Sequence, residues 1–152
     1  MTLRKGELIT KEYLYDFAVD GAISGVFQLR PTDPNGNELP TGFVVSKCAA
    51  VVETAITPSA SRTMTVGTET DADGFLADVI AVYNAGGVVR NGEIAGALLW
   101  DDTNDHEIDY KVPNVAASKS IVMEIGTGVL TAGKVRVILE GYVPSDAASY
   151  AP

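Results

Sequence analysis

The stretch KSIVMEIGTGVLTAGKVRVILEGYV, residues 119–143, carries the clearest structural pattern in the chain. Apolar residues occupy every second position in each half, at 121, 123 and 125 and again at 135, 137 and 139. This period of two, with many β-branched residues, is typical of strands that bury one face. Between the halves, the glycines of residues 126–133 provide the backbone freedom that a chain reversal needs. The pattern therefore predicts a long antiparallel hairpin over residues 118–143.

Shorter strand patterns recur through the rest of the chain. The longest, FVVSKCAAVVETAI at residues 43–56, is rich in valine and alternates only in part, which predicts one or two strands buried on both faces. About eight strands separated by turn residues favour an all-β fold, mainly antiparallel, of the jelly-roll or sandwich type. The shorter candidates are residues 13–17, 26–29, 64–66, 97–100 and 108–112.

One segment departs from the strand pattern. TDADGFLADVIAVY, residues 70–83, begins with a Thr-x-x-Asp sequence that resembles a capping box, and its apolar residues then follow helical spacing. We expect one short helix here. The ends lack a core pattern, so we expect extended termini: an N-terminal arm at 1–12, a single β-rich domain at 13–143 and a C-terminal tail at 144–152.

The composition suits a protein that assembles with others. Apolar residues make up 46% of the 152 residues although the formal net charge is −9, and the mean hydropathy is +0.14. This apolar excess indicates buried surface beyond a monomer's own core, at a subunit interface. The acidic balance argues against a nucleic-acid partner, which clustered Lys and Arg would bind.

The same sequence predicts a protein made in a cytoplasm and not inserted in a membrane. No stretch approaches 18 uncharged apolar residues, so no membrane-spanning helix is expected. The N-terminal residues lack the apolar run of a secretory signal peptide, so no signal peptide is expected.

Residues suited to catalysis are scarce. The chain has one histidine, His106, and one cysteine, Cys48, too few for a zinc site built by this chain alone. Cys48 lies in the valine-rich stretch, where a buried thiol has a raised pKa and is unreactive. We therefore expect no enzyme activity and no cofactor.

Two acidic segments are candidates for cation binding. Residues 69–74 match the first half of an EF-hand loop, but Ile80 occupies the position where a bidentate glutamate is required. The second segment, DDTNDHEID at 101–109, lacks the glycine of such a loop and is typical of a solvated turn. It remains a weak metal candidate through Asp101, Asp102, Asp105 and Glu107.

The N-terminal residues differ in charge from the rest. Arg4, Lys5 and Lys11 against Glu7 give the first 11 residues a charge of +2, which leaves −11 for the remaining 141. Two interpretations stay open: an arm that contacts an acidic neighbour, since unlike charges steer docking, or a tail without consequence.

Two stretches resemble the head decoration, or cement, proteins of tailed bacteriophages. They are VGTETDADGFLADVIAV at 66–82, similar to a GTExDxDGFL segment of that group, and the closing pattern TAGxVxVxxxGY at 131–142. The resemblance covers about half the chain, and its motifs are structural. It implies a non-enzymatic virion protein that forms trimers on the outer capsid surface, binds the major capsid protein and stabilises the shell.

On this interpretation the N-terminal arm contributes capsid or neighbour contacts through Leu3, Arg4, Lys5 and Leu8. Two alternatives from the same sequence are another virion β module associated with the tail or fibre, and a carbohydrate-binding jelly roll. The second would be calcium-dependent through the acids of residues 101–107.

Overall fold

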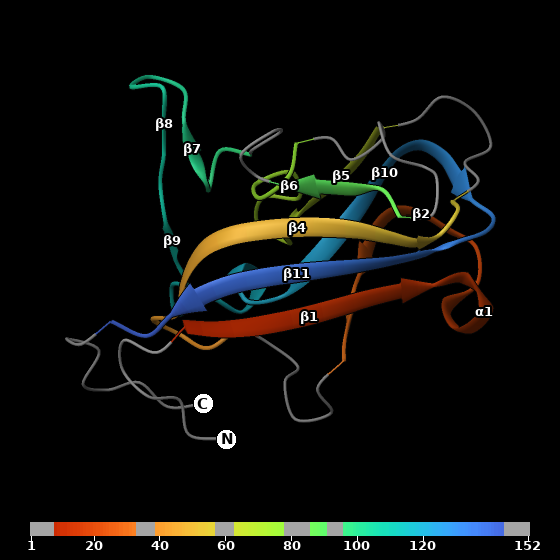
Figure 1. Cartoon of the computed structure of the whole chain (residues 1–152), viewed down its shortest axis with the longest axis horizontal. Helices are drawn as coiled ribbons and strands as arrows, with labels where there is room; N and C mark the ends of the chain where they lie inside the picture. The colour runs from red at the N-terminus through yellow and green to blue at the C-terminus, as the bar shows by residue number, and fades with distance from the viewer. Residues whose placement is uncertain (1–7, 33–38, 57–62, 78–85, 91–95, 145–152) are drawn as a thin grey trace.

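The computed structural model describes residues 8–32, 39–56, 63–77, 86–90 and 96–144. Strands dominate these residues, and the expectation of an all-β, mainly antiparallel fold of the sandwich type is confirmed (Figure 1). No helix among them is long and apolar enough to cross a membrane. The elements in chain order are β1 Leu8–Asp16, α1 Phe17–Asp20, β2 Ile23–Gln28, β3 Arg30–Pro31, β4 Val44–Thr54, β5 Thr63–Thr68, β6 Val88–Arg90, β7 Trp100–Asp101, β8 His106–Glu107, β9 Tyr110–Lys111, the 3₁₀ helix η1 Ala116–Ser118, β10 Ile121–Leu130 and β11 Lys134–Tyr142.

The larger sheet has six strands, in the order β3-β1-β11-β4-β6, and β9 also pairs with β4. Its centre is β11, which pairs antiparallel with β1 over its whole length and with β4 on its other side. The burial of β11 alternates strictly, with its odd-numbered residues buried and its even-numbered residues half-buried. One face of this sheet therefore belongs to the core and the other faces outward.

The second sheet has three strands in the order β2-β10-β5. The hairpin predicted over residues 118–143 is therefore wrong, because β10 and β11 are consecutive in the chain but pair in different sheets. The strands themselves are confirmed. Residues 131–133 carry the chain from one sheet to the other, and Gly133 has a φ of +114°, a conformation that favours glycine.

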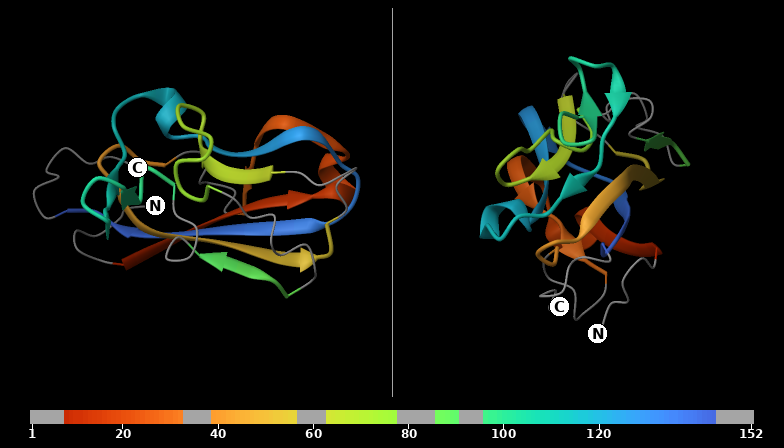
Figure 2. Two further views of the ribbon diagram at one scale, coloured as in Figure 1. Left: turned by 90° about the horizontal axis from the view of Figure 1, so that it is seen from above. Right: turned by 90° about the vertical axis from the view of Figure 1, so that its left-hand side faces the viewer.

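The core fills the space between the two sheets, which Figure 2 shows as two layers in its left-hand view. Valine, leucine, isoleucine and tyrosine side chains from both sheets meet there in one continuous cluster. The expectation that residues 43–56 are buried on both faces is wrong for their central part, because Lys47 and Glu53 on β4 are exposed whereas Cys48, Ala50 and Val52 are buried. Strand β4 covers the core with one face only.

The helix expected at 70–83 is wrong over residues 70–77, which form turns that fold back on β5; residues 78–83 lie outside the described residues. The N–H groups of Phe75 and Leu76 both donate to the carbonyl of Val66. This close return depends on Gly67, because a Cβ there would overlap the carbonyl oxygen of Asp71. The apolar residues thus reach the core from an irregular loop, and the one α-helix of the described chain is the four-residue α1.

The bounds of three strands differ from those expected from the sequence. Strand β1 begins at Leu8, so residues 8–12, predicted as part of the N-terminal arm, pair with β11 instead. The strands expected at 97–100 and 108–112 shrink to β7 and β9, since turns occupy residues 97–99. Residues 1–7 and 145–152 lie outside the described residues, so the extended termini remain a prediction.

Two buried tyrosines on β1 differ in one hydrogen bond, which gives a test of the packing. Tyr15 donates its hydroxyl to the carbonyl of Gly21 at 3.0 Å, whereas the hydroxyl of Tyr13, 1% exposed, has no hydrogen-bond partner within the described residues. A buried polar group without a partner costs about 1–3 kcal/mol. We therefore expect Tyr13→Phe to raise the free energy of unfolding and Tyr15→Phe to lower it by about 1 kcal/mol.

Urea denaturation of the two variants beside the parent chain measures both effects. Each substitution removes one tyrosine hydroxyl group from a buried position on β1, so each serves as the control for the other. A loss of stability in Tyr13→Phe as large as that in Tyr15→Phe would show that the Tyr13 hydroxyl has a partner.

Candidate interaction surface

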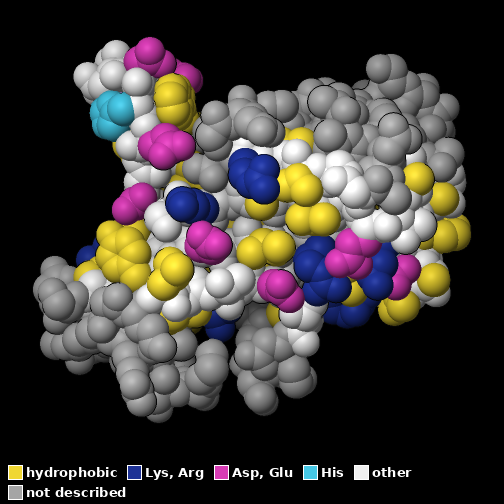
Figure 3. Space-filling view, viewed as in Figure 1, with side chains coloured by type: hydrophobic (Ala, Val, Ile, Leu, Met, Phe, Trp, Pro, Cys, Tyr) yellow, Lys and Arg dark blue, Asp and Glu magenta, His cyan; other side chains and the backbone are white. Residues whose placement is uncertain are grey.

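The outer face of the six-stranded sheet is covered by no other element among the described residues. Residues paired across neighbouring strands point to the same side of a sheet, so the pairs Ile138–Ala49 and Arg136–Val51 share this face. The apolar members of these pairs and Val88 on β6, which pairs with Val51, form a half-buried band across three strands, with Arg136 at its end. Figure 3 shows this band with charged side chains along its borders.

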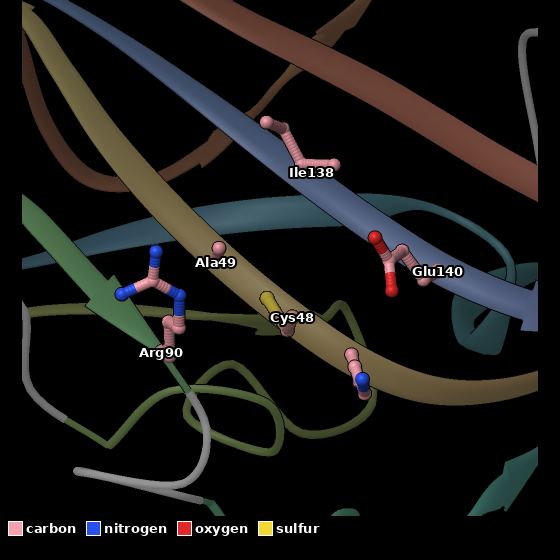
Figure 4. A pocket seen from close by; sticks show the side chains of 6 residues that line it. Cys48, Ala49, Arg90, Ile138 and Glu140 are labelled. Carbon is pink, nitrogen blue, oxygen red and sulfur yellow. The ribbon is translucent and has the colours of Figure 1, made fainter.

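A shallow depression of about 100 Å³ lies in this face where β4 runs between β11 and β6. Figure 4 shows Arg90 on β6 and Glu140 on β11, on opposite sides of β4, with Ala49 on β4 and Ile138 farther along β11. Cys48 also borders the depression but is only 1% exposed, and burial raises the pKa of its thiol. The expectation of a buried core cysteine is confirmed, and the depression offers no thiolate for chemistry.

Three cations lie along β4 on or beside this depression: Lys47 on β4 itself, Arg90 opposite Ala49, and Lys111 opposite Val44. Their residues are exposed, and their side chains make no ion pair or hydrogen bond within the part of the chain that the structure describes. Glu140 is the acid nearest in register, opposite Lys47. We call Lys47, Arg90 and Lys111 the cationic edge of the outer face.

The other end of the same face is charge-balanced. Arg136 donates to Glu12 on β1 and to Glu53 on β4, and Lys134 lies 3.4 Å from the same Glu53. One guanidinium thus joins the three central strands of the sheet. Hydrogen bonding by Arg136, together with the charge of Lys134, lowers the pKa of Glu53.

This network predicts a pH-dependent contribution to stability. Because the pKa of Glu53 is lowered in the folded chain, its contribution is present above the ordinary glutamate pKa of about 4.3 and is lost as the pH falls through the folded value. We expect Arg136→Met to lower the free energy of unfolding at pH 7 by about 1 kcal/mol, the upper range for half-exposed ion pairs. The difference between parent and variant should shrink towards pH 3.

Denaturant titrations at pH 7 and pH 3 measure this difference. Lys111→Met is the matched control, since that exposed cation has no acidic partner within the described residues and its removal should change stability little at either pH. An Arg136→Met deficit that stayed constant with pH would show that the loss comes from packing of the arginine stem and not from its ion pairs.

The acidic candidates at 101–107 lie on a hairpin formed by β7 and β8. Asp101 accepts hydrogen bonds from the backbone N–H groups of Thr103 and Asn104 and from the side chain of Asn104, and these bonds lower its pKa. The residues 102–107 are exposed. No group of three or more His, Cys, Asp or Glu side chains among the described residues is arranged to hold a metal ion. Asp101 therefore closes its own turn, and its neighbours face outward.

The acids of the EF-hand-like segment are positioned differently from an EF-hand. Burial, followed by a hydrogen bond with Asp73, raises the pKa of Asp71. The pair belongs to the turns that return the chain to β5.

The N-terminal candidates are only partly visible. Leu3, Arg4 and Lys5 lie outside the described residues. Leu8 is the first residue of β1, opposite Tyr142, and its side chain is 68% exposed. An exposed leucine beside a sheet edge is available for contact with a partner.

The cationic edge has no counterpart among the site residues expected from the sequence. Lys47 interrupts a valine-rich stretch, and that interruption was the available signal for an outward-facing position on β4. Arg90 and Lys111 come from distant segments, and only the pairing of β6 and β9 with β4 places them near Lys47.

No protein-family model matches the chain, and neither does any curated protein. Among solved structures, the fold is similar to that of a chain in the capsid asymmetric unit of cyanophage Pam1, with a TM-score of 0.58 and 17% identity over 92% of this chain and 87% of that one. A chain of the acid-stable capsid of Helicobacter pylori bacteriophage KHP30 is also similar, with a TM-score of 0.49 and 18% identity over 93% of this chain and 92% of that one. The first likeness establishes a shared fold.

Proposed function

We propose that this chain is a structural, non-catalytic component of a phage virion that binds the outer surface of the capsid as a trimer and stabilises the shell. The observation that carries the proposal is the fold shared, over most of both chains, with a chain of a cyanophage capsid asymmetric unit. The likeness to phage decoration proteins in residues 66–82 and 131–142 agrees with it.

The glycines of those two stretches support a structural role for the motifs. Gly67, Gly74, Gly133 and Gly141 lie where an added Cβ would overlap neighbouring atoms. At Gly141, for example, the Cβ would approach within 2.8 Å of the Phe43 ring. Such positions serve close packing and carry no reactive group. A sequence pattern of this kind marks a shared scaffold.

Binding supplies the mechanism of stabilisation. A protein that binds the assembled shell and not its separated subunits favours the assembled state by mass action. An uncovered sheet face with an apolar band and bordering charges offers a surface for such binding, because interfaces combine an apolar centre with a polar rim. No bond needs to be made or broken.

We further propose that Leu3, Arg4, Lys5 and Leu8 contact the major capsid protein or a neighbouring copy. The exposed side chain of Leu8 and the +2 charge of the first 11 residues support this role. Because β1 begins at Leu8, removing residues 1–7 should weaken shell binding and leave the fold intact. Equal binding by the truncated and full chains would refute the contribution of Leu3, Arg4 and Lys5.

Copy number and position in the virion test the proposal. Quantitative mass spectrometry of virions that contain the chain should find hundreds of copies, and antibodies against it should label the head in electron micrographs. A few copies confined to the tail would overturn the capsid assignment in favour of a tail or fibre module. Shells stripped of the chain should break at lower temperature and regain stability when the purified chain is added back.

A further inference from the structure

The hairpin of β7 and β8 is set apart from the rest of the described chain. Its two strands form a sheet of their own, continued by the hydrogen bond from Ile108 N to the Leu99 carbonyl. Figures 1 and 2 show it projecting from the body of the sandwich. A lone two-stranded hairpin is at best marginally stable in water, and packing against another surface stabilises it.

The hairpin carries a dense negative charge. Residues 101–109 include five acids and no lysine or arginine, and the side chains of Asp102, Asp105 and Glu107 make no ion pair or hydrogen bond within the described residues. Figure 3 shows acidic side chains at the projecting end. Repulsion among these charges decreases when cations approach them.

The cationic edge has the opposite property on the same molecule. Lys47, Arg90 and Lys111 are exposed cations without ion pairs in the described chain, on a protein of net charge −9. Lys47 and Arg90 also line the depression. By contrast Arg30, Lys134 and Arg136 each pair with an acid of the same chain. The described part of each copy thus presents an acidic projection and a cationic surface whose charges are not paired within that part.

We propose that the β7–β8 hairpin of one copy docks on the cationic edge of the next copy, with Asp102, Asp105 and Glu107 facing Lys47 and Arg90. The partner is a second copy because this chain itself presents both complementary surfaces. This inference rests on the proposed self-assembly and names the surfaces that carry it.

The geometry of such a contact limits the assembly. The contact joins two different surfaces, so it is head-to-tail, and repeated copies close into a ring if the rotation between neighbours allows. Any closed ring, the proposed trimer included, uses every hairpin and every cationic edge. Glu140 also borders the depression, so the contact neutralises only part of the hairpin charge. Because the contact joins exposed charges, it should weaken as added salt screens them.

Charge reversal tests the contact directly. The face variant carries Lys47→Glu and Arg90→Glu, the hairpin variant carries Asp102→Lys and Glu107→Lys, and the combined variant carries all four substitutions. Lys119→Glu is the control, because that lysine lies between η1 and β10 and hydrogen-bonds Asn114. Light scattering measures the molar mass in solution, and circular dichroism checks that each variant folds.

We expect about 48 kDa for the parent and the control, which is three times 16.0 kDa. The face and hairpin variants should fall towards 16.0 kDa, and the combined variant should return to the trimer mass because its reversed charges again attract. The control, face, hairpin and combined variants should all remain folded.

Trimers that persist in both reversal variants would overturn this contact while leaving the proposed trimer intact. A combined variant that stays dissociated would also overturn it, since the losses would then not arise from the pairing of these charges. If the parent stays monomeric at all concentrations, the proposed contact between copies in solution is wrong. Binding to the capsid is tested separately by virion labelling.

Discussion

Gly133→Ala is expected to destabilise the chain by about 3–5 kcal/mol, from backbone strain and overpacking together. Gly133 has a φ of +114°, and a Cβ there would lie 2.7 Å from the Ile56 Cα and 2.9 Å from the Ala55 carbonyl oxygen. Its own carbonyl also accepts a hydrogen bond from Phe17 N at 3.0 Å. The nearest atom is the Ile56 side-chain Cγ2, but the other two belong to the backbone just after β4, which cannot move aside without shifting the end of that strand.

Gly21→Ala separates the two causes. Gly21 has a φ of +74° and a ψ of −167°, a combination almost confined to glycine, but nothing lies within 4 Å of its added Cβ, so its replacement should show strain alone, about 1–3 kcal/mol. The melting temperature of Gly133→Ala should fall by roughly 6–20 °C for a chain of this length. Equal losses in the two variants, measured by calorimetry and denaturant titration, would show that the packing around Gly133 can relax.

The position of Gly133 also explains why the sequence predicted the strands at 118–143 but paired them wrongly. Alternation reports which residues share a face, and both β10 and β11 show it clearly. A glycine-rich connection is compatible with a tight reversal within one sheet and equally with a passage between two sheets. The choice depends on β1 and β4, which occupy both edges of β11, and on β2 and β5, which occupy both edges of β10.

In the segment expected to form a helix at 70–83, the burial of the apolar residues was predicted correctly but the backbone conformation was not. Its apolar residues do reach the core, since Phe75 and Leu76 are fully buried, but helical spacing gave the wrong backbone. The deciding contacts are with residues distant in the sequence: a Cβ at Gly74 would lie 2.5 Å from Leu98 Cδ1, and Leu98 N donates to the Gly74 carbonyl. A local pattern cannot report such contacts.

The candidate site was predictable only in part. The acidic segment at 101–109 was visible as a run of charges, and its placement on a projecting hairpin follows from the turn that Asp101 closes. The cationic edge assembles from β4, β6 and β9, which are far apart in the chain, so no spacing rule could group its members. Pairing in the sheet creates that surface.

Phe75→Ala should cost about 3–5 kcal/mol, the range for removing a buried phenylalanine side chain. Phe75 is 0% exposed and packs edge-on against Tyr110 of β9, with ring centroids 5.7 Å apart. Its N–H donates to Val66 at 3.0 Å, and its carbonyl accepts from Gly96 N at 3.1 Å. The ring therefore anchors the loop after β5 to the strand at the base of the β7–β8 hairpin, and its loss leaves a cavity at that junction.

Phe17→Ala is the matched control, because Phe17 is 38% exposed on α1 and its truncation removes less buried surface. Urea titration of both variants should give a loss several times larger for Phe75→Ala, and hydrogen exchange should rise first in residues 66–77 and 96–112. If the contact with Tyr110 matters beyond burial, Phe75→Leu should recover most of the volume but not the ring interaction, worth about 0.5–1.5 kcal/mol. Equal losses for Phe17→Ala and Phe75→Ala would contradict the anchoring role, since a surface ring would then stabilise the fold as much as a buried one.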